Sequence, residues 1–377
     1  MKKWFLHILL LAGLFGMLTT SCSQEVEGLE EVVEKQKVML RFTIALDEPK
    51  ATSRSWNGYD EDDNTPRNDE KLGTIDENKI NNVHALLYDL NGVLMGKLDT
   101  ATPEVVESSA NEHVYTVVGS VEVDADKVSN LDFKLMVLAN CSSPANLNET
   151  DTHTFVNPNT TNGNGIPMWG IATYTGVDLR NSLTAGTAYD LTNVTSNQAP
   201  VYMLRSMAKI EVTLSEETIA SGYSLSGASL NKSFNNGYVV PAYKNENGNQ
   251  LTLEALAATT DLGIDEVFHP MQNGATTDNA VFTGSNNTFY IYVPEYDTSD
   301  NTPLEIGLTL TNGGSSETKS FKHGQYTDGS FQNAWDVIRN HYYKYTVSMK
   351  NGADLEVIIE INPWNYRDVT YDNTPLT

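Results

Sequence analysis

Alternation of apolar and polar side chains over short segments most limits what this 377-residue chain can fold into. The clearest case is residues 37–46, where Met39, Arg41 and Thr43 stand between five apolar residues. Those five are Val38, Leu40, Phe42, Ile44 and Leu46. A period of two is typical of a half-buried β-strand, and no long segment has the 3.6-residue period of an amphipathic helix. The pattern predicts an all-β protein.

Further strands follow along the chain. Residues 83–90 and 93–98 flank the turn pair Asn91-Gly92, which predicts a hairpin. The other strands are predicted at 113–123, 131–139, 201–214, 288–293, 304–310, 318–323, 342–349 and 355–361. Asn351-Gly352 predicts a second hairpin, and residues 333–340 one short helical turn. We place a domain boundary between residues 197 and 198, which gives two β-sandwiches in series.

The N-terminus carries an export signal. Lys2 and Lys3 precede the apolar residues 4–18, a stretch of signal-peptide length, and Cys22 follows. A cysteine at this place resembles the lipobox of bacterial lipoproteins, although Leu18 lies four residues before it rather than the usual three. The alternative is an ordinary secretory signal with an incidental cysteine. Both interpretations predict an exported chain.

Composition excludes several classes of partner. Asp and Glu number 49 against 24 Lys and Arg, a formal net charge of −25, which repels nucleic acid and anionic membrane surfaces. If Cys22 is lipidated, Cys141 has no intramolecular partner, so no disulfide framework is expected. Stability must then come from the packing of sheets.

The sequence holds no pattern typical of an enzyme, so we expect neither catalysis, cofactor nor metal. The histidines after the signal lack metal-ligand spacing, and no Gly-x-Ser-x-Gly elbow is present. The acidic residues 60–63 fit a solvated loop better than a calcium site.

Arg205 and Lys209 share one face of a predicted strand, where we expect them to be solvated edge charges. Trp56, Trp169, Trp335 and Trp364 fit core plugs better than platforms for glycans.

Three motifs in order resemble a known family. Residues 205–212 read Arg-Ser-Met-Ala-Lys-Ile-Glu-Val, residues 338–343 read Ile-Arg-Asn-His-Tyr-Tyr, and residues 355–365 read Leu-Glu-Val-Ile-Ile-Glu-Ile-Asn-Pro-Trp-Asn. With Cys22 and Ile166-Pro167-Met168, they resemble the fimbrillins of Bacteroidetes, the subunits of surface fimbriae. The resemblance implies two tandem transthyretin-like β-sandwich domains. The chain would divide into a signal peptide (1–21), a lipidated propeptide (22–54) and domains at 55–197 and 198–377.

The resemblance also implies a mechanism of assembly by donor-strand exchange. A lipidated precursor reaches the outer membrane with its first strand completing its own sheet. A trypsin-like protease cuts after an arginine in the next loop, the strand leaves, and a C-terminal segment of a neighbouring subunit replaces it. The residues that would take these roles are Cys22 for lipidation, Val38, Leu40, Phe42, Ile44 and Leu46 for the pro-strand, and Val369, Tyr371 and Leu376 for the donor.

Two arginines compete as the site of cleavage. Arg54 lies closer to the pro-strand and has small, uncharged neighbours, whereas Asp69 and Glu70 follow Arg67 and would hinder a trypsin-like protease. We therefore prefer Arg54, with Arg67 as the runner-up.

The expected partners are copies of this chain, other fimbrial subunits, an arginine-specific protease and, through the lipid, the outer membrane. The mature subunit would lie in the extracellular fimbria and support adhesion. Alternatives are a fimbrial tip or anchor subunit, a surface glycan-binding lipoprotein of a nutrient-uptake system, and an exported enzyme.

Overall fold

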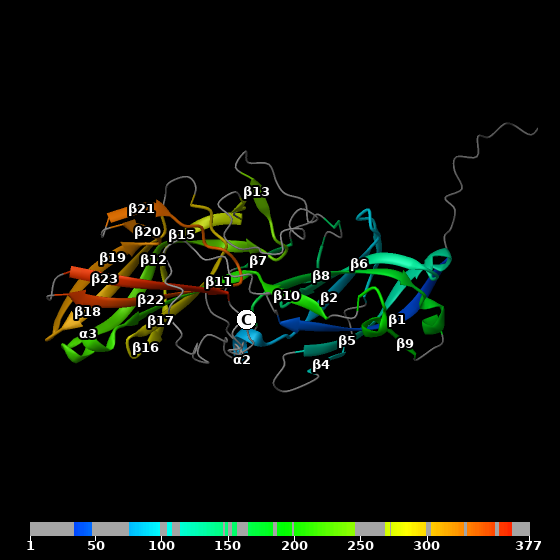
Figure 1. The fold of residues 1–377 in the computed structure, drawn as a ribbon, viewed down its shortest axis with the longest axis horizontal. Coiled ribbons are helices and arrows are strands. Elements are labelled where there is room, and N and C mark those ends of the chain that lie inside the picture. The colour runs from blue at the N-terminus through cyan, green and yellow to red at the C-terminus, as the bar shows by residue number, and fades with distance from the viewer. Residues whose placement is uncertain are drawn as a thin grey trace, which may run out of the picture. The chain divides into compact units, whose positions relative to one another are not determined.

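The computed structural model of the chain is nearly all β, which confirms the predicted fold class (Figure 1). It describes residues 34–46, 75–98, 104–107, 114–145, 148–149, 153–156, 165–183, 187–197, 200–245, 268–271, 273–298, 303–327, 330–350 and 354–363. All structural statements below concern these residues.

The first sheet has nine strands in the order β3-β2-β6-β8-β10-β1-β5-β4, with β9 also paired to β1. In chain order these are β1 (Lys35–Leu46), β2 (Val83–Tyr88), β3 (Leu94–Lys97), β4 (Glu104–Glu107), β5 (Val114–Asp124), β6 (Leu131–Ala139), β8 (Met168–Val177), β9 (Ala188–Asp190) and β10 (Val201–Arg205). Met95 of β3 and Val117 of β5, near opposite ends of this order, belong to the same apolar cluster, so the sheet curves around its own core.

Two five-stranded sheets enclose a second apolar cluster. One has the order β16-β17-β11-β22-β23, with β11 (Met207–Leu214), β16 (Thr283–Ser285), β17 (Thr288–Pro294), β22 (His341–Lys350) and β23 (Asp354–Pro363). The other has the order β15-β12-β18-β19, with β12 (Tyr223–Tyr238), β15 (Asn273–Val281), β18 (Glu305–Asn312) and β19 (Ser315–Lys322), and β7 (Thr154–Val156) added beside β12. This arrangement is a β-sandwich.

Two small ribbons and a few helical turns complete the described structure. The ribbons are β13 (Tyr243–Asn245) with β14 (Phe268–Pro270), and β20 (Gly324–Thr327) with β21 (Ser330–Ala334). The α-helices are α2 (Ile75–Asn78) and α3 (Glu216–Ala220), and the 3₁₀ turns are Ala125–Lys127, Leu179–Leu183 and Leu191–Asn193. Among the described helices, none has the length and hydropathy that a membrane span requires.

Most strand predictions agree with the structure. The first hairpin is present as β2 and β3, with Leu86 opposite Lys97 and Gly92 in the turn at a φ of 84°. Lys350 pairs with Asp354 at the ends of β22 and β23, as the second hairpin requires. The helical turn expected over residues 333–340 is wrong, because β21 runs to Ala334 and Val337 forms a bridge with Tyr296.

The single strand predicted over residues 201–214 is also wrong. Buried Ser206 divides it into β10, in the first sheet, and β11, in the sandwich. Its N–H donates to the Pro167 carbonyl over 2.8 Å and its hydroxyl to the Val239 carbonyl over 2.8 Å. In β10 the buried apolar residues are the odd-numbered Val201 and Met203, whereas from Ala208 to Leu214 in β11 they are the even-numbered ones. Such a change is expected where the chain passes from one sheet to another.

The longest described strand, β12, did not appear among the predictions. Its pairing shifts between Leu225 and Gly227 and again between Phe234 and Asn236. Each bulge moves later side chains to the opposite face, which destroys a simple alternation in the sequence.

The division into two domains stays a prediction. The chain has two apolar clusters, but by its contacts Gln36–Thr377 forms one compact unit. The transthyretin-like character of each half likewise stays an expectation.

Gly170 in β8 tests the pairing of β8 with β10. A Cβ atom at Gly170 would lie 2.4 Å from the Tyr202 carbonyl oxygen, so Gly170→Ala must push the backbones of the two strands apart. We expect a loss of roughly 1–3 kcal/mol in the free energy of unfolding, measured by urea denaturation. Gly227→Ala in β12 is the matched control, since its Cβ would meet nothing closer than 3.9 Å; an equal loss in both variants would contradict this explanation.

Candidate functional site

Strand β1 lies inside the first sheet, between β10 and β5. It pairs in parallel with β10 through Ile44 and Val201, and in parallel with β9 through Met39 and Ala188. It therefore has neighbours on both sides, and the sheet around it is continuous.

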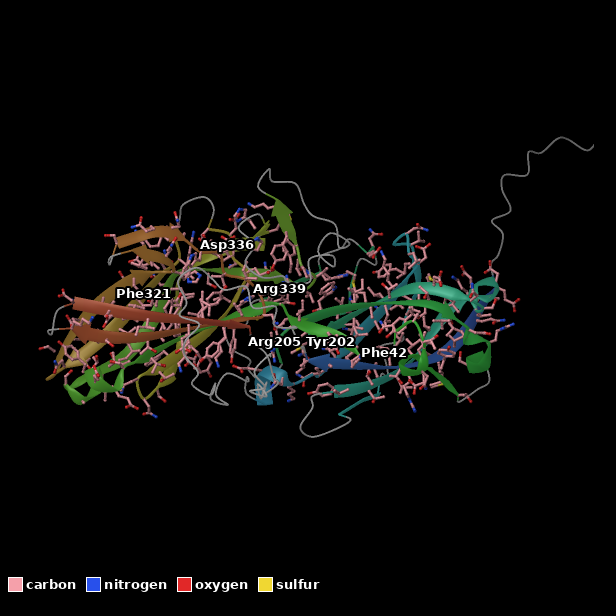
Figure 2. All side chains as sticks on the ribbon, viewed as in Figure 1. Phe42, Tyr202, Arg205, Phe321, Asp336 and Arg339 are labelled. Carbon is pink, nitrogen blue, oxygen red and sulfur yellow. The ribbon has the colours of Figure 1, made fainter. Side chains whose placement is uncertain are left out.

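The apolar face of β1 forms part of the first core (Figure 2 labels Phe42 on this strand). Val38, Leu40, Phe42 and Ile44 are 0 % exposed, and Leu46 is 4 % exposed. Arg41 on the opposite face is exposed. The predicted strand is thus present with its predicted face inward, while its role as a removable pro-strand stays a prediction.

The other residues predicted to act in assembly lie outside the described residues. These are Cys22, Arg54, Arg67, Val369, Tyr371 and Leu376. The described part of the C-terminus ends with β23, which lies at the edge of its sheet and pairs there with β22.

Arg205 and Lys209 are buried, so the expectation that they are solvated edge charges is wrong. Arg205 is 0 % exposed and donates to Asn78 and, over 3.3 Å, to the Asn340 side chain. Lys209 forms an ion pair with buried Glu77 at 3.0 Å. Asn78 and Glu77 belong to α2, and because Asn78 lies 127 positions before Arg205 in the chain, no local pattern reveals this contact.

Glu77 also accepts a hydrogen bond from the Tyr292 hydroxyl on β17. Burial, followed by the negative charge of Glu77, raises the pKa of Tyr292 far above its ordinary value. The phenol therefore stays protonated and keeps donating. Together these contacts attach α2 to the start of β11 and the end of β17.

A second buried ion pair joins Arg339 and Glu295 at 2.6 Å (Arg339 is labelled in Figure 2). Arg339 also donates to the carbonyls of Val239 and Tyr238, over 2.6 and 3.0 Å, and the Tyr243 hydroxyl donates to Glu295. Burial and then Glu295 raise the pKa of Tyr243 well above its ordinary value. A buried pair with this many partners fixes geometry, because removing one member would leave an unpaired charge inside the protein.

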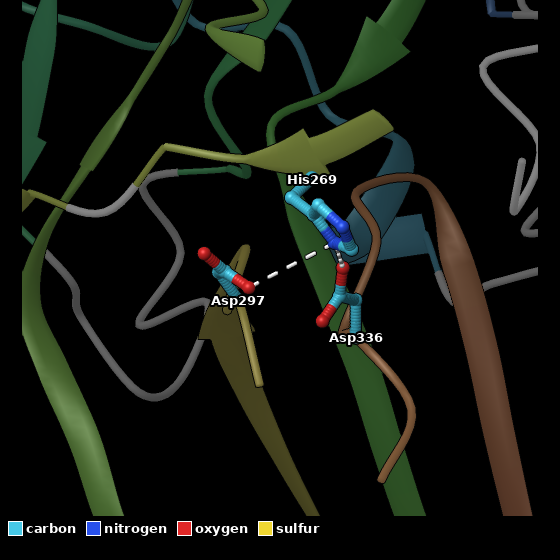
Figure 3. A group of neighbouring side chains, drawn as sticks. All are labelled: His269, Asp297 and Asp336. Carbon is cyan, nitrogen blue, oxygen red and sulfur yellow. Dashed lines mark hydrogen bonds and ion pairs between the residues drawn. The ribbon is translucent and has the colours of Figure 1, made fainter. Parts of the chain in front are cut away.

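One group of side chains has the composition of a metal site (Figure 3). His269, Asp297 and Asp336 each offer a ligand atom, and these three atoms all lie within 4.8 Å of one another. His269 Nδ1 lies 2.8 Å from Asp336 Oδ2 and 3.8 Å from Asp297 Oδ1. The search of the sequence for metal-ligand spacing missed this group, because its members come from three separate segments.

His323 is a neighbour of this group, because it contacts the backbone of Asp336. It is 0 % exposed, its Nδ1 shares a hydrogen bond with the Tyr345 hydroxyl, and its Nε2 lies 3.4 Å from the Asp336 carbonyl oxygen. Burial lowers the pKa of His323 to about 4. The imidazole is therefore neutral in the folded protein near neutral pH.

The described tryptophans do not form a platform for a glycan. Trp169 is 6 % exposed and belongs to the first core, and Trp335 packs edge-on against His323 with ring centroids 5.8 Å apart. Trp56 and Trp364 lie outside the described residues.

One family model matches part of the chain. Residues 55–205 match the family model described as "Major fimbrial subunit protein (FimA)". No curated protein sequence matches the chain.

Among solved structures, a provisionally named cell adhesion protein from Parabacteroides distasonis is similar, with a TM-score of 0.52 and 15 % identity over 87 % of this chain and 97 % of that one. This likeness shows a shared fold. A fimbrial assembly protein from the same species covers 87 % of this chain and 98 % of its own, with 14 % identity and a TM-score of 0.47.

The buried histidine makes stability depend on pH. In the unfolded chain His323 takes up a proton near its ordinary pKa of 6.5, whereas the folded protein resists protonation down to about pH 4. Its contribution to stability is therefore complete above pH 6.5 and is lost as the pH falls. Between pH 7 and pH 4 we expect the free energy of unfolding to decrease by roughly 3 kcal/mol through this residue.

Urea denaturation of the wild type and of His323→Gln at both pH values measures this effect. The variant is less stable at pH 7 but loses less stability on acidification. Equal losses in the two proteins would show that other groups cause the acid sensitivity.

Proposed function

Because residues 55–205 match the family model of the major fimbrial subunit (FimA), we propose that this chain is a structural subunit of a bacterial surface fimbria that polymerises by protease-triggered donor-strand exchange. The observation that carries the proposal is the place of β1: an N-terminal strand inside a sheet, with its apolar face buried, just before the proposed cleavage loop. The subunit assembles with copies of itself and with other fimbrial subunits, and its role is structural rather than catalytic.

In the precursor, β1 occupies the position that a neighbouring subunit later fills. The lipid on Cys22 holds the precursor at the outer membrane, and a trypsin-like protease cuts after Arg54. The match to the fimbrial family begins at Ser55, directly after this arginine, which supports the choice over Arg67. The lipid and β1 then leave together, and the mature subunit enters the extracellular fimbria.

Loss of β1 would expose a groove between β10 and β5. The vacated positions are those of Val38, Leu40, Phe42, Ile44 and Leu46, and full burial of such side chains is worth roughly 1.5–3 kcal/mol each. The backbone groups of β10 and β5 that face β1 would also lose their partners. An open groove is therefore unstable, and any strand with the same spacing of apolar residues is strongly favoured to enter it.

The donor that we propose is the C-terminal segment beyond β23. Val369, Tyr371 and Leu376 would insert into the groove of the next subunit, with main-chain hydrogen bonds supplying affinity and the alternate side chains setting the register. This arrangement makes a chain of subunits in which each one completes the sheet of its neighbour.

Cleavage at one arginine is the first test. Limited treatment of the full precursor with an arginine-specific protease should produce a new N-terminus at Ser55 and a ladder of oligomers that survive SDS without heating. Arg54→Ala should abolish both, whereas the matched control Arg67→Ala should leave both unchanged. A chain without residues 366–377 should be cut at Ser55 but stay monomeric. Monomers from the fully cut wild type would contradict the proposal.

Locking β1 in place tests its release separately. Ala45 and Tyr202 are direct partners in the parallel pairing of β1 with β10, within the Cα separation that a disulfide bridges. An oxidised Ala45→Cys/Tyr202→Cys variant, with Cys22 and Cys141 replaced by serine, should be cut after Arg54 yet form no oligomers. Dithiothreitol should restore the ladder in the same sample. Oligomers from the oxidised protein would show that β1 need not leave.

A further inference from the structure

We propose that His269, Asp297 and Asp336 bind a divalent first-row metal ion, with Zn²⁺ as the best-fitting ion. The site would join the β13–β14 ribbon to the sandwich. It is independent of donor-strand exchange, so its test does not depend on polymerisation.

An isolated β-bridge brings the two carboxylates together. Tyr296 and Val337 exchange both of their backbone hydrogen bonds, each 2.9 Å long. Asp297 follows Tyr296 and Asp336 precedes Val337, so antiparallel geometry places the two aspartates opposite each other. Asp297 is 6 % exposed. Like charges in this position destabilise a sheet unless a cation lies between them.

The imidazole comes from the ribbon. His269 lies on β14 directly opposite Lys244 on β13. Its Nδ1 atom points toward both carboxylates, 2.8 Å from one and 3.8 Å from the other (Figure 3). Zn²⁺ binds nitrogen and oxygen ligands at about 2.0–2.2 Å, so tetrahedral ligand atoms lie roughly 3.4 Å apart. The two distances from Nδ1 lie on either side of this value, and the two carboxylate oxygens lie within 4.8 Å of each other.

Other side chains already orient the two carboxylates. The Lys244 ammonium pairs with Asp297 Oδ2, while the Thr298 N–H and hydroxyl donate to Asp336 Oδ1 over 2.7 and 3.1 Å. In each aspartate the second oxygen, Asp297 Oδ1 or Asp336 Oδ2, is the one that faces His269. Outer contacts of this kind fix the direction of metal ligands and increase affinity.

The ligand set selects the class of ion. One imidazole nitrogen and two carboxylate oxygens suit Zn²⁺, with water in the fourth position. Ca²⁺ prefers six to eight oxygen ligands, which this group does not supply. His269 would bind through Nδ1 as the tautomer with its proton on Nε2. The Lys244 charge opposes the ion, but because it pairs with the other oxygen of Asp297 it does not take the ion's position.

Calorimetric titration of the metal-free full chain, without a histidine tag, tests the site. We expect one Zn²⁺ per chain, bound at least ten-fold more tightly than Ca²⁺ or Mg²⁺, and a higher melting temperature with Zn²⁺ than with EDTA. Asp336→Asn and His269→Gln should each raise the Kd for Zn²⁺ at least ten-fold. Asp178→Asn is the matched control, because Asp178 is an exposed aspartate paired with Arg180 outside the group.

Far-UV circular dichroism in EDTA establishes that each variant is folded before its Kd is compared. The visible absorption of bound Co²⁺ in the wild type gives a readout that needs no variant, and we expect the bands of a nitrogen- and oxygen-ligated ion. No Zn²⁺ binding by the wild type, unchanged affinity in both Asp336→Asn and His269→Gln, or equal affinity for Ca²⁺ would each overturn the proposal.

Discussion

A strand inside a sheet cannot be removed without leaving two rows of unpaired backbone groups and an empty space in the core. Strand β1 is such a strand, because β10 and β9 pair with it in parallel, β5 lies on its other side, and its alternate side chains are fully buried. The first sheet therefore depends on some strand in this position, though not on which chain supplies it. That distinction between the position and its occupant underlies the proposed polymerisation.

The buried polar network explains how the rest of the fold could survive loss of β1. The cleavage loop leads into α2, and Glu77 and Asn78 of α2 are held by Lys209, Tyr292 and Arg205. Breaking a buried ion pair costs roughly 3–5 kcal/mol, so these contacts fix the chain from α2 onward. Cleavage after Arg54 would then release the segment before the cut and leave the segment after α2 in place.

A period of two in the sequence predicts β1 and β5, the Asn91-Gly92 turn pair predicts the β2–β3 hairpin, and a continuous apolar run predicts β6. Local periodicity fails where the period is broken. The change of phase between Met203 and Ala208 is visible in the sequence and could have located the break at Ser206, whereas the bulges of β12 conceal that strand. The contacts of Arg205 and the His269 group join segments far apart in the chain, which no local pattern encodes.

Covalent connection accounts for the order of events in the proposed assembly. Before cleavage β1 is tethered to the sheet that it completes, so its effective concentration there is in the millimolar range or above, and a donor strand from solution cannot compete. Cutting the loop converts β1 into a separate peptide that dilutes once it dissociates. The donor, in contrast, stays attached to a folded subunit, and each insertion buries apolar side chains again. In the proposed assembly, proteolysis would thus supply the direction of the reaction without nucleotide hydrolysis, because the tether cannot form again.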